Sequence, residues 1–269
     1  MKVLKKIGSF FAALVPFFVL LGAQVIIMFL CLLGVAAVEL MKNGRIIEAL
    51  TPNCEIIMTM MMHFICLAAA YFEFKVHRFH LNDISPVKQN VKVYIPAVFL
   101  AAGAFFVFRF FSSVFYKVTG LTYTVPSASI ANSFIVLIII VVLEETVLEE
   151  FVLRGLLIKT FEMRFPVWVG IIVSILAYVP CRSSYTMFYS LLFGAMLVLI
   201  RWKFGDIKLC MLVHFIMGIL DRIIPVTDDS TYETVINVGS AAGVVVAAGA
   251  MFLMLKFASG SEQASDISK

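Results

Sequence analysis

Charged residues are scarce in this sequence of 269 residues. Only 14% are Asp, Glu, Lys or Arg, whereas 62% are hydrophobic, and the mean hydropathy is +1.03. A soluble globular domain carries about 25% charged residues and about 45–50% apolar ones. The scarcity of charge therefore excludes an ordinary soluble domain. Runs of about 20 apolar residues indicate helices that span a membrane.

Cysteine motifs that bind metals or exchange electrons are also missing. The five cysteines show no CxxC spacing, and most lie in or beside apolar runs; they are Cys31, Cys54, Cys66, Cys181 and Cys210. This pattern indicates thiols that face lipid or the core rather than a disulfide framework. The net charge of +4 comes from basic residues in short connections between apolar runs, which membrane topology explains. Membrane lipids, and no nucleic acid, are therefore the expected surroundings.

The apolar runs predict an all-α polytopic membrane bundle of about eight transmembrane helices. No segment shows the alternation of a strand, and no internal repeat is evident. The predicted spans cover roughly residues 10–38, 55–74, 92–116, 128–161, 166–181, 185–202, 206–224 and 233–257. They divide the chain into a three-span region (1–127), a core (128–224), a last helix (225–257) and a disordered polar tail (258–269).

The distribution of basic residues predicts the orientation. With these spans, 14 of the 21 Lys and Arg residues fall on the side of the two termini, and five fall on the other side. Cytoplasmic connections carry an excess of Lys and Arg. We therefore expect a multi-pass protein of the plasma membrane with both termini in the cytoplasm.

The fourth predicted span holds an unusual group of charges. Glu149, Glu150 and Arg154 lie within the apolar sequence EEFVLR, and Glu145 precedes them by one helical turn. Charges inside a membrane are costly, so they usually face the bundle interior or a wet cavity and mark a functional site. Glu150 and Arg154 are four residues apart in the order that favours a helical ion pair. A buried ion-pair network that locks the helices together remains an equal alternative to acid–base chemistry.

The sequence EEFVLRG at 149–155 is similar to the EExxxR motif of the CAAX-protease and bacteriocin-processing family (CPBP, or Abi). In that family a span ending in FxxxH follows, then another span, then a span with HxxxN. Here Ala177 stands at the Phe position and Cys181 at the His position of the second element. His214 begins the third element, and Gly218 stands where the family has Asn. The resemblance covers the core region and implies a CAAX-protease-like bundle.

The resemblance also implies roles for the matching residues. Glu149 matches the carboxylate that activates water, and Glu150 and Arg154 match its supporting pair. His214 matches a residue that stabilises the oxyanion or, in an older interpretation, binds a metal. No cofactor is firmly predicted. A divalent metal is neither predicted nor excluded, because one carboxylate and one imidazole are fewer ligands than a zinc site usually has.

Two of the four catalytic positions depart from the family pattern. Cys181 is a poor substitute for a proton-carrying imidazole, and Gly218 has no side chain to donate a hydrogen bond. Loss of one oxyanion donor costs about 10²–10³ in rate, and general acid–base help is worth about 10²–10⁴. Asp221 lies about 10 Å further along the helix than His214, too far to replace the missing Asn.

Three functions follow from these observations. The first is a catalytically degenerate family member that acts as a membrane scaffold, regulator or immunity-type factor and binds a peptide or membrane-protein partner. The alternative is an active Glu-dependent intramembrane endopeptidase that tolerates Cys181 and Gly218. The third is an ion-coupled transporter, against which the missing repeat counts.

Three further features carry structural predictions. Gly239 and Gly243 form a GxxxG motif in the last span, which predicts close helix packing. Arg109 is expected to extend to the interface or to pair inside the bundle. His63 is expected to be a packed polar side chain.

Overall fold

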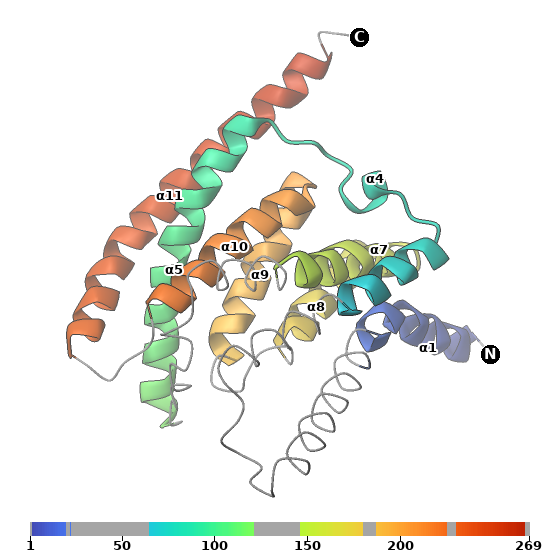
Figure 1. Cartoon of the computed structure of the whole chain (residues 1–269), viewed down its shortest axis with the longest axis horizontal. Helices are drawn as coiled ribbons and strands as arrows, with labels where there is room; N and C mark the ends of the chain where they lie inside the picture. Colours follow the sequence, from blue (N-terminus) through green and yellow to red (C-terminus); the bar gives the residue numbers. More distant parts are fainter. Residues whose placement is uncertain are drawn as a thin grey trace, which may run out of the picture.

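The computed structural model describes residues 2–19, 22, 65–120, 146–179, 187–224 and 230–266. Every regular element in these segments is a helix (Figure 1). The elements are α1 (Lys2–Ala13), a helix over residues 65–76, α4 (Leu81–Ile84), α5 (Val91–Thr119), the π-helix η1 (Glu150–Leu157), α7 (Ile158–Glu162), α8 (Val167–Tyr178), α9 (Met187–Phe204), α10 (Ile207–Ile223) and α11 (Ser230–Asp266). The chain is an all-α membrane helical bundle, as predicted.

Three of the described helices are long and apolar enough to cross a membrane. They are Val91–Thr119, Met187–Phe204 and Glu233–Ala258, and Val167–Tyr178 is a shorter apolar helix. Most of the first two predicted spans, and the start of the fourth, lie outside the described residues, so the number of eight spans stays a prediction. The last helix continues to Asp266, beyond residue 257, where the predicted last span ends.

Helices α5 and α11 run side by side along one flank of the bundle (Figure 1). Their backbones approach closely at glycines: a Cβ atom added to Gly103 would lie 2.6 Å from the carbonyl oxygen of Gly243. One added to Gly239 would lie 2.6 Å from the ring of Phe106. The predicted GxxxG packing is therefore confirmed, with α5 as the partner helix.

The turn between α9 and α10 fixes the start of the helix that carries His214. Gly205 has a φ of +67°, and a side chain there would also collide with Val87, so glycine is required. Asp206 then caps α10, because its carboxylate accepts a hydrogen bond from the backbone N–H of Lys208 at 2.9 Å. The same carboxylate accepts hydrogen bonds from the hydroxyls of Ser85 and Tyr94. A buried capping carboxylate thus ties α10 to the α4–α5 connection.

The helix that carries the EEFVLR motif differs from its prediction in one respect. The apolar run predicts one α-helix over residues 128–161. In its described part, the structure has α-helical residues 146–149, then η1, then α7. A π-turn adds one residue per hydrogen-bonded ring and displaces the side chains that follow, and such turns occur frequently at functional sites. One displaced carbonyl is satisfied from a neighbouring helix, because Ser174 of α8 donates a hydrogen bond to the Leu153 oxygen at 2.9 Å.

Candidate functional site

Four charged or ionisable side chains from two helices meet in the bundle interior. His214 of α10 lies with Nδ1 2.7 Å from Oε1 of Glu150 and with Nε2 3.7 Å from Oε2 of Glu149. Arg154 lies one turn further along η1, with Nη1 3.2 Å from the same oxygen of Glu150. We call Glu149, Glu150, Arg154 and His214 the charged cluster. The predicted ion pair between Glu150 and Arg154 is confirmed.

The charged cluster is almost closed to solvent. Glu150 and Arg154 are fully buried, His214 is 2% exposed, and Glu149 is 7% exposed. Buried charges are tolerated when they are paired. Glu150 and Arg154 form such an ion pair, although the three guanidinium nitrogens of Arg154 and Oε2 of Glu150 make no hydrogen bond. Glu149 is the member with most access to a ligand or water.

Aromatic rings from α8 and α9 pack against Arg154 and His214. The Arg154 guanidinium lies 4.6 Å from the ring centroid of Tyr178, within cation–π range. The edges of Tyr178 and Phe193 meet His214 at centroid distances of 6.0 and 5.0 Å. Tyr178 itself rests against Gly194, where a Cβ atom would lie 3.1 Å from the ring. The motif comparison missed Tyr178, although it adjoins the Ala177 position where an aromatic residue was expected.

Cys181 and Gly218 are the two candidate site positions that differ from the family motif. Cys181 lies outside the described residues. Gly218 lies on α10, one turn beyond His214, and brings no side chain toward the cluster. The expected catalytic roles of Glu149, Glu150, Arg154 and His214 therefore stay predictions, whereas their proximity is an observed feature.

A second ion pair, buried at its arginine, joins α5 to the far end of α10. Arg109 donates a hydrogen bond to Asp221, and its guanidinium lies 5.5 Å from the ring centroid of Phe105 and 5.1 Å from that of Tyr189. Of the two alternatives predicted for Arg109, pairing inside the bundle is confirmed. Asp221 is engaged here, away from the Gly218 position, which agrees with the distance argument from the sequence. The pairing with Asp221 itself was not predicted.

Among the described residues, the charged cluster does not form a group that could hold a metal ion. Both ring nitrogens of His214 face carboxylates, and no described group of three His, Cys, Asp or Glu side chains is arranged to hold a metal ion. Elsewhere, Nε2 of His77 lies 3.5 Å from Oε2 of Glu73, and His63 lies outside the described residues.

A comparison with protein families gives a match to part of the chain. Residues 131–220 match the family model described as type II CAAX prenyl endopeptidase Rce1-like. The matched segment contains all four members of the charged cluster. No curated protein and no solved structure matches the chain.

Proposed function

We propose that this chain, a membrane protein of the CAAX-protease family, is a catalytically degenerate member that binds a peptide or membrane-protein partner without cleaving it efficiently. The family membership comes from the match over residues 131–220 together with the helical membrane fold. The degenerate character is inferred from the charged cluster.

The contacts of His214 are the observation that carries this proposal. An imidazole that stabilises an oxyanion must present a free N–H to the substrate oxygen. Here Nδ1 is engaged by Glu150 at 2.7 Å, and the Glu149 carboxylate, 3.7 Å from Nε2, occupies the position in front of the second ring nitrogen without a direct hydrogen bond to it. The cluster therefore resembles a closed ion-pair network that locks η1 to α10 more than an open catalytic site.

The missing donor at Gly218 supports the same conclusion. His214 has no neighbouring amide side chain one turn along α10 to share oxyanion stabilisation. An absent donor costs about 10²–10³ in rate. Replacement of the second-element histidine by Cys181 removes acid–base help worth about 10²–10⁴.

An active endopeptidase is the second candidate, and one observation favours it. Glu149 keeps 7% exposure, and its 3.7 Å separation from His214 exceeds a direct hydrogen bond. A substrate that drew the Glu149 carboxylate away from His214 would free both groups for water activation.

A gain-of-function experiment tests the proposal. We would reconstitute the full chain in proteoliposomes and measure cleavage of quenched-fluorescent prenylated CAAX peptides and double-Gly leader peptides. The double variant Cys181→His, Gly218→Asn is expected to cleave at least about 10²-fold faster than the natural chain.

The matched control is the same double variant with Glu149→Gln, which should lose the gained activity. Cleavage by the natural chain at a rate equal to that of the double variant would refute degeneracy. Failure of the double variant to gain activity would refute the idea that these two positions are what the site lacks.

A further inference from the structure

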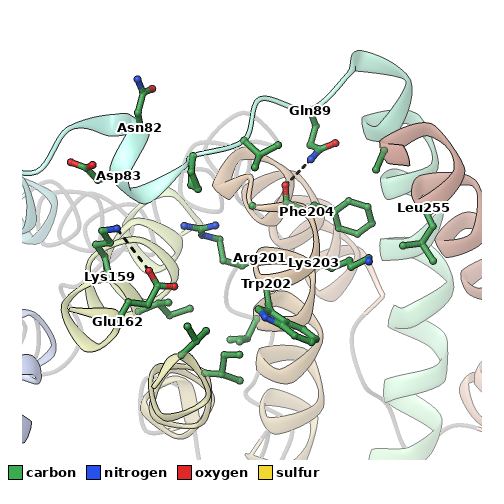
Figure 2. Close-up of a pocket in the computed structure, with 18 residues that line it drawn as sticks. Asn82, Asp83, Gln89, Lys159, Glu162, Arg201, Trp202, Lys203, Phe204 and Leu255 are labelled. Atoms are coloured by element: carbon green, nitrogen blue, oxygen red, sulfur yellow. Dashed lines mark hydrogen bonds and ion pairs between the residues drawn. The ribbon is translucent and has the colours of Figure 1, made fainter. Parts of the chain in front are cut away.

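A cavity of about 770 Å³ opens at the end of the bundle where α9 ends and α5 begins (Figure 2). It lies between the α7–α8 region, the last turn of α9, the connection that follows α4, and Leu255 of α11. Two of the helices that can cross a membrane, Met187–Phe204 and Glu233–Ala258, end at residues that line this cavity. We therefore expect the cavity to lie at the level where lipid headgroups meet the hydrocarbon core.

Cationic and apolar side chains share the lining of this cavity. Lys159 of α7 and Arg201 and Lys203 of α9 supply positive charge, while Val167, Ile171 and Val198 supply an apolar wall. Figure 2 shows Lys159 and Arg201 coming from opposite walls of the cavity. Trp202 also lines it and is 64% exposed. Tryptophan is enriched at membrane–water interfaces.

Arg201 is the least satisfied of these cations. The residue is 8% exposed, its Nη2 donates a hydrogen bond to the Ile84 carbonyl oxygen at 2.6 Å, and its buried Nε has no partner. Glu162 and Asp206 act on Arg201 electrostatically from a distance, but among the described residues neither forms an ion pair with its guanidinium; Glu162 pairs with Lys159, and Asp206 accepts from Ser85. A buried guanidinium without a carboxylate in direct contact favours a phosphate.

The carboxylates that line the cavity, Glu162 and Asp83, make their closest contacts with groups other than Arg201. Glu162 is 3.9 Å from Nζ of Lys159, and Asp83 accepts a hydrogen bond from the backbone N–H of His80 at 2.6 Å. An anion that enters the cavity would therefore compete with Glu162 for Lys159 and would meet Arg201 directly. The size of the cavity and its apolar wall suit a ligand with a hydrocarbon part, which inorganic phosphate lacks.

We propose that this cavity is a binding site for an anionic phospholipid. Arg201 and Lys159 hold the phosphate of the headgroup, and the wall of Val167, Ile171 and Val198 receives the upper part of an acyl chain. The sequence predicts that this end of the bundle faces the cytoplasm, where anionic lipids concentrate and basic residues attract them.

Tryptophan quenching tests the site directly. The chain has two tryptophans, Trp168 and Trp202, so Trp168→Phe leaves Trp202 as the reporter inside the cavity. We would reconstitute the full chain in phosphatidylcholine vesicles and add phosphatidylglycerol or phosphatidylcholine with brominated acyl chains. Brominated phosphatidylglycerol is expected to quench Trp202 at a several-fold lower mole fraction than brominated phosphatidylcholine.

Charge variants in this background identify the residues. Lys159→Gln and Arg201→Gln should each reduce the preference for phosphatidylglycerol about fivefold, by the loss of one cation. Glu162→Gln should increase the preference, since it removes the competing carboxylate. The matched control is Lys208→Gln, because Lys208 is an exposed lysine of α10 at the same end of the bundle that does not line the cavity.

Three results would overturn the proposal. Equal quenching by both lipids would mean that no headgroup is recognised, and a preference unchanged by both Lys159→Gln and Glu162→Gln would place the recognition elsewhere. Displacement of the quencher by inorganic phosphate as effective as displacement by unlabelled phosphatidylglycerol would make the ligand a soluble anion.

Discussion

Replacement of Glu150 by glutamine is expected to destabilise the protein strongly. Glutamine keeps the shape of the side chain but removes the charge that faces both Arg154 and His214. Arg154 is fully buried, and Glu150 is its ion-pair partner in the described residues, at 3.2 Å. A buried pair that loses one member costs about 3–5 kcal/mol, because the other charge is left uncompensated. For a chain of this size that corresponds to a fall in Tm on the order of 10 °C.

Unfolding in detergent micelles measures this effect, and two further variants show its cause. The double variant Glu150→Gln, Arg154→Met removes both charges and should recover most of the lost stability. Glu162→Gln, at the exposed last residue of α7, breaks an ion pair of 3.9 Å and should change stability by less than about 0.5 kcal/mol. A Glu150→Gln loss below about 1 kcal/mol, or a double variant less stable than the single one, would refute the reasoning.

Three other tests probe the contacts between the helices by the same unfolding measurement. Gly103→Ala should destabilise by about 1–3 kcal/mol, because its Cβ would collide with the α11 backbone. The control Gly249→Ala, which has nothing within 4 Å, should be neutral or stabilising by up to about 1 kcal/mol; equal effects would contradict the close approach of α5 and α11. Arg109→Gln and Asp221→Asn should show a coupling energy of about 1 kcal/mol in a double-mutant cycle, since Asp221 is 36% exposed; additive losses would mean that the pair is not formed. Ser174→Ala should lower the stability by about 1 kcal/mol, because the Leu153 carbonyl oxygen loses its hydrogen-bond donor. An unchanged Tm would mean that this hydrogen bond does not stabilise the protein.

The sequence was sufficient for the helical class and for the members of the charged cluster. The four-residue spacing of Glu150 and Arg154 predicts their pairing because it is a local, one-turn relation. His214 was found only through the order of motifs along the chain, since no local rule links it to a helix 64 residues away. The charged residues of the EEFVLR sequence are equally compatible with a closed ion-pair network and with a catalytic site.

The features that the sequence did not predict are long-range or local distortions of regular structure. In the π-helix each backbone hydrogen bond spans one residue more than in an α-helix, but the apolar pattern of the sequence is also compatible with an α-helix. Arg109 and Asp221 are 112 residues apart, and hydropathy carries no information about which intramembrane charges meet. The cavity with Arg201 depends on the connection after α4 folding back over the end of α9, which residue composition does not encode.

The rate of peptide cleavage by the natural chain and by Glu149→Gln tests the central claim most directly. Both would be reconstituted in the same proteoliposomes, with prenylated CAAX peptides in excess and the protein level checked after each assay. A degenerate site predicts equal rates, both at the background of empty vesicles. A natural chain that cleaves while Glu149→Gln does not would contradict the account and would make this protein a working endopeptidase.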